Sequence, residues 1–304
     1  MRRITTALIF LAFLLSLGNT STASAAQKPS KPVIYTVNYP LEYFAGRIAG
    51  DLVQIVFPAP ANVDPAFWVP DEATLVKYQQ ADLILLNGAN YAHWLTTVSL
   101  PVNRMVNTTQ SVAGQYIYSS DVVTHTHGPT GQHSHESLAS DTWLDMNIAV
   151  VQARTIAHAL IKLLPEHKEI LTQNLNNLVE ELDALDIDLQ SISDTNGNHE
   201  LLASHPVYQY FSRRYRFNLQ SVHWEPEDVQ PMSEWQHLEI LLEKFPAKWM
   251  IWEMPPLQET VDALARQGIT PLVFYTLANR PAQGDFMSVM HQNVDSLRSI
   301  LEGM

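Results

Sequence analysis

Histidine is the residue of this chain best suited to metal chemistry, and four histidines lie within one short segment. They form two His-x-His pairs, His125 with His127 and His133 with His135. Neighbouring imidazoles bind borderline metal ions such as zinc, copper and nickel. The surrounding Gly, Pro, Ser and Thr residues are typical of a surface loop. We therefore expect the loop 124–136 to capture metal ions; the alternative is a solvated loop that is rich in histidine by chance.

Two further candidate ligands come at the ends of predicted strands. His205 follows the run 200–204, and Glu253 ends the run 249–253. Open α/β sheets bind their ligands at the carboxyl ends of strands. A charge placed there is costly unless it is paired or bound to a ligand. We expect His205 and Glu253 to converge on a cation; structural hydrogen bonding of both side chains is the alternative.

Asp141 and His93 complete the candidate set. Asp141 opens the segment Asp-Thr-Trp-Leu-Asp, where it either binds metal or caps a helix N-terminus. His93 follows a predicted strand by about one helical turn, and His223 with Glu225 forms a further possible pair. Three or four nitrogen and oxygen ligands satisfy zinc, so the four main candidates predict a zinc site. One more carboxylate would favour manganese.

These residues need a scaffold, and short β-type runs that alternate with helical patterns predict an α/β protein with parallel sheets. The predicted strands cover residues 33–38, 53–58, 81–87, 201–204, 249–253 and 271–275, and the shorter helices cover 40–49, 71–80, 206–216, 234–245, 256–267 and 285–302. Leucines at spacings of three and four predict one long helix over 166–191, after a break at Pro165. The predicted fold is therefore two α/β lobes with parallel sheets, bridged by a long rigid helix.

Residues 1–26 are predicted to be a cleaved signal peptide. Two arginines precede an apolar run of about 14 residues, which is shorter than the roughly 20 residues of a membrane span, and Ala23-Ser24-Ala25 fits a cleavage site. We therefore expect the mature chain in the periplasm. Its predicted parts are an N-terminal lobe over 27–142 that includes the histidine-rich loop, linking helices over 143–192 and a C-terminal lobe over 193–304.

Composition excludes several classes of function. The chain of 304 residues has 18 Lys and Arg against 31 Asp and Glu, and its net charge of −13 argues against a nucleic-acid partner. The absence of cysteine excludes thiolate zinc sites, disulfides, cysteine catalysis and iron–sulfur clusters. No glycine-rich phosphate loop, His-Glu-x-x-His or Gly-x-Ser-x-Gly motif is present in the sequence. We therefore expect a binding protein rather than an enzyme.

Several segments together resemble one protein family. They are 64–70 (DPAFWVP), 81–95, 141–145 (DTWLD), 205–211 (HPVYQYF) and 284–290 (GDFMSVM). As a set they are similar to motifs of the periplasmic metal-binding proteins of zinc- and manganese-type ABC importers, over essentially the whole mature chain. The resemblance implies two lobes with a rigid linking helix, which bind zinc, or else manganese, and deliver it to an ABC importer permease in the inner membrane. We expect a monomer.

The ligand positions of that family are altered in this chain. Its first two ligand histidines fall on Ala66 and Asp141, the third is retained as His205, and its aspartate falls on Tyr275. The site is then either rebuilt around the candidates above or lost as a metal site. Loss would leave a binding protein for a metal chelate or a small organic ligand, or a periplasmic zinc buffer that acts through the histidine-rich loop. A zinc hydrolase with Glu253 as general base is a further alternative.

Overall fold

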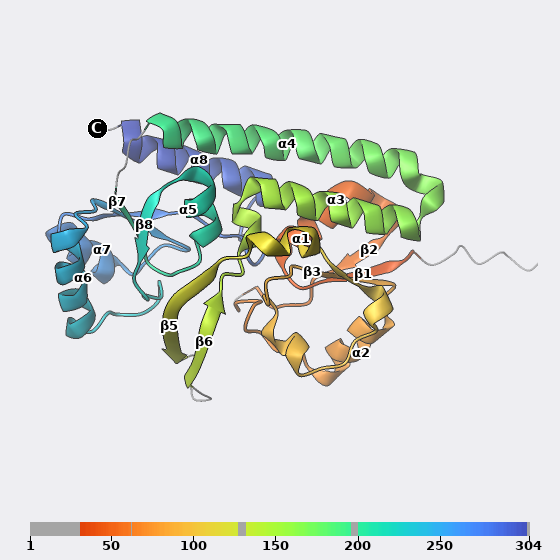
Figure 1. Cartoon of the computed structure of the whole chain (residues 1–304), viewed down its shortest axis with the longest axis horizontal. Coiled ribbons are helices and arrows are strands. Elements are labelled where there is room, and N and C mark those ends of the chain that lie inside the picture. Colours follow the sequence, from red (N-terminus) through yellow and green to blue (C-terminus); the bar gives the residue numbers. More distant parts are fainter. Residues whose placement is uncertain (1–30, 62, 127–131, 196–199, 303–304) are drawn as a thin grey trace, which may run out of the picture. The chain divides into compact units, whose positions relative to one another are not determined.

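Two four-stranded parallel sheets form the scaffold of this chain (Figure 1). The computed structural model describes residues 31–61, 63–126, 132–195 and 200–302. The predicted signal peptide and His127 lie outside these ranges. Within them, no helix is both long and apolar enough to cross a membrane.

The first lobe contains a sheet with the strand order β2-β1-β3-β4, in which every pair is parallel. Its strands are β1 (Val33–Thr36), β2 (Gln54–Val56), β3 (Leu83–Leu86) and β4 (Met105–Asn107), and its helices are α1 (Tyr39–Ala49) and α2 (Glu72–Gln80). The predictions for β1, β2 and β3 are confirmed. Strand β4 is not predicted, because three half-buried residues at a sheet edge carry no periodic pattern.

The second lobe contains a sheet with the strand order β10-β9-β7-β8, again with every pair parallel. Its strands are β7 (Glu200–Ala203), β8 (Asn218–Ser221), β9 (Trp249–Trp252) and β10 (Thr270–Val273), and its helices are α5 (Gln209–Tyr215), α6 (Met232–Lys244), α7 (Gln258–Arg266) and α8 (Phe286–Glu302). The predictions for β7, β9 and β10 are confirmed. Strand β8 (NLQS) is not predicted, because it is a polar edge strand.

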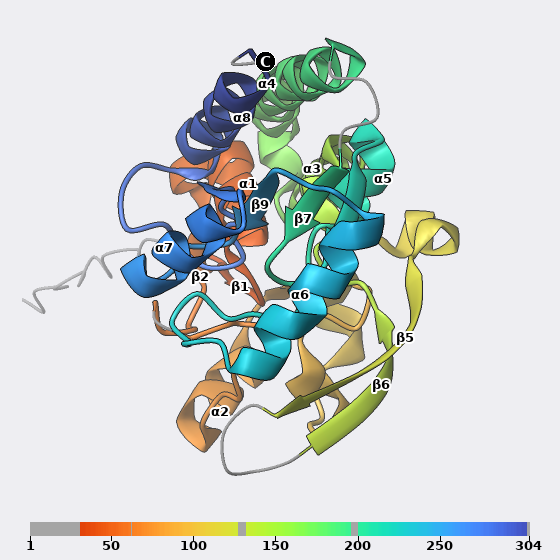
Figure 2. The same ribbon diagram turned by 90° about the vertical axis from the view of Figure 1, so that its left-hand side faces the viewer.

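Helices α3 (Met146–Leu163) and α4 (Lys168–Thr195) link the two lobes. A 3-10 turn over Pro165–His167 separates them, so α4 begins slightly later than predicted. With 28 residues α4 is about 42 Å long. It contacts α1 of the first lobe and α5 and α8 of the second, and Figure 2 shows it alongside α8. The predicted fold class, two parallel-sheet lobes bridged by a long helix, is confirmed.

The histidine-rich segment differs from the predicted loop. It contains an antiparallel pair of strands, β5 (Tyr118–Thr126) and β6 (Gln132–Leu138). The register places His125 opposite His133, and His135 opposite Val123. The loop prediction is wrong here because it weighed Gly, Pro and Ser, whereas the Val and Thr residues among them favour paired strands.

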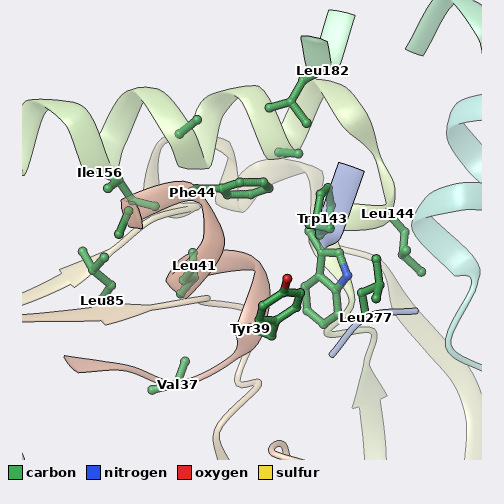
Figure 3. Packing of buried hydrophobic residues seen from close by; sticks show 14 of the residues in the cluster. Val37, Tyr39, Leu41, Phe44, Leu85, Trp143, Leu144, Ile156, Leu182 and Leu277 are labelled. Carbon is green, nitrogen blue, oxygen red and sulfur yellow. The ribbon is translucent and has the colours of Figure 1, made fainter. Parts of the chain in front are cut away.

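Buried side chains and hydrogen bonds connect the lobes. One continuous hydrophobic cluster includes Tyr39, Trp143 and Leu277, which lie close together in Figure 3. The Trp143 indole N–H donates to the carbonyl of Thr276 over 2.7 Å, and the Tyr39 N–H donates to the carbonyl of Ala278 over 3.1 Å. The segment that follows β10 is therefore fixed to the start of α1 and to the segment before α3. Because this contact is buried, it limits movement of one lobe against the other.

Candidate metal site

Three polar side chains of the second lobe follow three neighbouring strands. His205 lies two residues after β7, Glu225 lies four residues after β8, and Glu253 directly follows β9. The parallel order β9-β7-β8 brings their carboxyl ends to one edge of the sheet. His205 Nε2 lies 3.6 Å from Glu225 Oε1, and His205 Nδ1 lies 3.6 Å from Glu253 Oε1. The imidazole thus stands between two carboxylates.

Backbone hydrogen bonds hold His205 at this edge. The N–H of Ser204 donates to the carbonyl of Ile251 over 2.9 Å, and the N–H of Trp224 donates to the carbonyl of Ser204 over 2.7 Å. The Tyr208 hydroxyl donates to the carbonyl of Phe274 over 2.7 Å. These bonds extend the sheet contacts past the ends of the strands, so the scaffold rather than a free loop positions the imidazole.

Asp141 contributes a buried carboxylate from the segment before α3. Its side chain is 8% exposed and accepts a 3.0 Å hydrogen bond from Ser140 Oγ. Burial, followed by the negative charge of Asp64, raises the pKa of Asp141 to about 8. Asp141 precedes a 3-10 helix over Thr142–Leu144, but its side chain makes no capping hydrogen bond, so the capping alternative is wrong. A buried carboxylate of this kind calls for a cation or a proton.

Glu253 shares its surroundings with carboxylates of the first lobe. Burial raises the pKa of Glu253 well above its ordinary value, and the next largest contributions come from the charges of Asp141 and Asp64. Glu225 and Glu227 add smaller effects of the same sign. Charges from both lobes therefore act on Glu253, which also contacts His205. We call Asp64, Asp141, His205, Glu225 and Glu253 the carboxylate–histidine cluster. A divalent cation would relieve its repulsion.

Asp64 and Tyr91 belong to this neighbourhood, and the sequence places them in family-like segments but not among the candidate ligands. Asp64 lies in an exposed turn, where its Oδ1 accepts a 2.8 Å hydrogen bond from the N–H of Ala66. Tyr91 is 2% exposed, and the charges of Asp64, Asp141 and Glu253 all act on its hydroxyl. Neither residue follows a predicted strand directly, so a rule based on strand ends does not find them.

His93 lies on the first lobe, where its ring packs edge-on against Phe67 at 4.8 Å between centroids. Its N–H donates to the carbonyl of Ala66 over 3.2 Å. This bond places His93 beside the turn that contains Asp64 and Ala66.

Two of the three altered family positions, Ala66 and Tyr275, have structural roles. Ala66 is 6% exposed within the first-lobe core. The backbone of Tyr275 is fixed by the Asn293 side chain of α8, which accepts from the Tyr275 N–H over 3.0 Å and donates to its carbonyl over 2.8 Å. His223 lies near the cluster, since its ring centroid is 6.1 Å from that of His205.

The cluster is a set of paired contacts rather than a finished coordination shell. Within the described residues, no three His, Asp or Glu side chains are grouped so that they could hold a metal ion. Ligand atoms bound tetrahedrally about 2.1 Å from zinc lie about 3.4 Å apart. The 3.6 Å contacts of His205 approach that separation.

A separate cavity of about 110 Å³ lies at the carboxyl end of the first sheet. Asn87, Asn90, Tyr91 and Asn107 are among the residues that line it, and none of its lining residues is charged. It therefore lacks a charged ligand for a cation.

The comparisons with known proteins agree on one family. The family model of the periplasmic zinc-uptake complex component A, ZnuA, matches residues 34–300. The chain is 23% identical over 296 residues to the high-affinity zinc uptake system protein ZnuA of Bacillus subtilis, covering 93% of this chain and 92% of that protein. It is 27% identical over 214 residues to the manganese ABC transporter substrate-binding lipoprotein PsaA of Streptococcus pneumoniae, covering 68% and 67%.

A longer relative is matched only in part. The chain is 22% identical over 301 residues to the zinc-binding lipoprotein AdcA of Streptococcus pneumoniae, which covers 95% of this chain and 60% of AdcA. Among solved structures, the metal-dependent lipoprotein YcdH of Bacillus subtilis is similar with a TM-score of 0.76 and 19% identity, over 88% of this chain and 98% of that one. This likeness concerns the fold. By its family match, the chain belongs to the ZnuA family of periplasmic zinc-uptake components, which are substrate-binding proteins and not enzymes.

Proposed function

We propose that this protein captures a divalent metal ion, most directly zinc, at the carboxylate–histidine cluster and delivers it to an ABC-type importer in the inner membrane. The observation that carries the proposal is the placement of His205 between Glu225 and Glu253, each 3.6 Å away. Negative charges from Asp141 and Asp64 add to this environment. The names of the relatives support zinc as the ion, and the acidic character of the cluster also admits manganese.

The proposed ligands are His205, Glu253 and Asp141, with His93 as a fourth candidate. An imidazole that binds metal through one nitrogen usually donates its other N–H to a carboxylate. Because Glu253 shares its surroundings with Asp141, we assign the metal to the Nδ1 side of His205. Glu225, on the Nε2 side, then orients the ring from outside the coordination shell.

We also propose where the protein works in the cell and how its chain is divided into parts. Residues 1–26 act as a cleaved signal peptide, and the mature protein works in the periplasm as a monomer. Its parts are the N-terminal lobe 27–142, the linking helices 143–192 and the C-terminal lobe 193–304. The buried contact between Trp143 and Thr276 supports a binding mode in which side chains move more than the lobes do.

A second function is favoured by one observation. Since the described residues contain no finished three-ligand group, the same region could take a metal that already carries a small chelator, or an organic ligand. The histidine-rich segment, including His125, His127, His133 and His135, is proposed as an auxiliary site that collects zinc. A zinc buffer that acts through this segment alone remains the competing proposal.

Zinc titration by calorimetry tests the main proposal. The metal-free mature protein is compared with His205→Ala and with His237→Ala, which alters an exposed histidine on α6. One tight binding event that is lost in His205→Ala and kept in His237→Ala supports capture at the cluster. Equal binding by all three proteins would overturn it. Zinc-limited growth of a strain complemented with either variant tests delivery.

A further inference from the structure

Asn87 is a polar residue at the end of an apolar strand in the first lobe. It directly follows β3, whose sequence is Leu-Ile-Leu-Leu, and its side chain is fully buried. Its Oδ1 accepts hydrogen bonds from Asn38 Nδ2 over 3.2 Å and from Gln152 Nε2 over 3.0 Å. Asn38 caps the N-terminus of α1, and Gln152 lies on α3. A buried amide is costly unless it is bonded in this way, so Asn87 joins three elements of the first lobe and the linking helices.

The same amide also holds the residues on both sides of Asp141. Asn87 Nδ2 donates to the carbonyl of Ser140 over 2.9 Å, and Thr142 Oγ1 donates to Asn87 Oδ1 over 3.3 Å. Ser140 Oγ in turn donates to Asp141 Oδ2 over 3.0 Å. Because Ser140 and Thr142 flank Asp141 in the chain, one side chain fixes both ends of this tripeptide.

Asp141 is the central residue of a tight turn. Its φ and ψ angles are −83° and 55°, and the N–H of Thr142 donates to the carbonyl of Ser140 over 2.8 Å. These features define an inverse γ-turn. The carbonyl of Ser140 thus accepts both the bond that closes the turn and the bond from Asn87. A turn that is held at both ends fixes the direction of the Asp141 side chain before a ligand binds.

We propose that Asn87 is a positioning residue for metal capture, whose amide holds the turn 140–142 so that the Asp141 carboxylate is in place when the ion arrives. This inference rests on the proposed function, in which Asp141 is a ligand. Groups that orient a ligand from outside the coordination shell change metal affinity by about 10-fold to 100-fold when they are removed. An amide that only stabilised the first lobe would change the melting temperature and leave the affinity of the folded protein unchanged.

A matched pair of asparagine variants tests this inference. Asn87→Ala removes the amide that holds the turn. Asn174→Ala is the control and removes an amide that joins α4 to α1, where Asn174 Nδ2 donates to the carbonyl of Ile48 over 3.0 Å. Both variants should lower the melting temperature. Only Asn87→Ala should also lower zinc affinity, by about tenfold or more in competition with a chromogenic chelator.

The same substitution in an Asp141→Ala background shows whether Asn87 acts through that carboxylate. There, Asn87→Ala should change zinc affinity by less than about twofold, because the group that it positions is gone. If Asn87→Ala does not fold, Thr142→Val carries the same comparison, since it removes the hydroxyl that bonds to Asn87 and keeps the shape of the side chain. Thr142→Val should lower zinc affinity about threefold when Asp141 is present and leave it unchanged when Asp141 is absent.

The possible outcomes separate this inference from the proposed function. Unchanged zinc affinity in the tested variant, or an equal loss with and without Asp141, would overturn the inference and leave the proposed function standing. Equal zinc affinity of Asp141→Ala and the unaltered protein would remove Asp141 from the ligands and overturn the inference, whereas loss of binding in His205→Ala would still support capture at the cluster. Failure of the unaltered protein to bind zinc would overturn the proposed function itself.

Discussion

Glu253 and His205 are in contact at the carboxyl ends of neighbouring strands, with Glu253 Oε1 3.6 Å from His205 Nδ1. Strands β9 and β7 pair in parallel directly below them, so sheet register sets this contact. Burial and the charges of Asp141 and Asp64 hold the pKa of Glu253 well above its ordinary value. In the metal-free protein Glu253 therefore retains a proton at pH values where an exposed carboxyl is ionised, and an incoming cation replaces that proton.

The two carboxylates beside His205 are predicted to differ in importance. Glu253→Gln removes a proposed ligand and should lower zinc affinity by at least about 100-fold. Glu225→Gln removes a partner that orients the ring and should lower affinity about tenfold. Competition with a chromogenic chelator measures both. A larger loss in Glu225→Gln would place the metal at Nε2 of His205 and contradict the assignment.

The stability of the metal-free protein should depend on the ionisation of Asp141. Its folded-state pKa of about 8 lies above the ordinary value of 3.8. The folded state therefore holds the proton more tightly than the unfolded state. This contribution to stability is complete below about pH 4 and is lost as the pH rises to about 8.

Asp141→Asn should flatten that dependence. Melting temperatures recorded between pH 5 and about pH 8 should fall with pH in the unaltered protein and fall less in the variant. Zinc affinity should rise over the same range, because the metal displaces a proton. An identical pH profile in the two proteins would show that Asp141 ionises normally.

Weakening the contact between the lobes should lower the free energy of unfolding. Trp143 is fully buried and its indole N–H donates to the carbonyl of Thr276. Trp143→Phe removes that bond and leaves a cavity, so we expect a loss of about 2–3 kcal/mol in urea unfolding. Trp235→Phe, on partly exposed α6, is the control and should cost less than about 1 kcal/mol. Similar losses in both variants would argue against a special role for the contact.

His93→Ala decides whether the first lobe supplies a nitrogen ligand. As the fourth proposed ligand, its removal should lower zinc affinity by about 100-fold or more, since ligand removal has effects at least as large as those of outer-shell partners. A change of less than about threefold would show that the ring only packs against Phe67 and does not bind the metal.

The sequence predicts those parts of the protein that have a clear local pattern of apolar residues. Strands β1, β3 and β9 are short apolar runs, and α4 has leucines at helical spacing, so all four are found. His205 and Glu253 are found as candidates for the same reason, since both stand at the ends of such runs.

Other features depend on contacts that no local pattern encodes. β8 is polar and is held as an edge strand by its register with β7. Asp64 and Tyr91 lie far from His205 in the chain and join its neighbourhood only because the two lobes pack together. In the sequence both are ordinary polar residues, so only the tertiary structure reveals that they belong to this neighbourhood.

Zinc titration of a chain that lacks residues 124–136, with and without His205→Ala, tests the central claim most directly. The deletion removes all four histidines of the histidine-rich segment and leaves the carboxylate–histidine cluster intact. We predict one tight site per molecule in the deleted chain, which disappears when His205 is replaced as well. Loss of all zinc binding on deletion alone would contradict capture at the cluster and would assign the function to the histidine-rich segment.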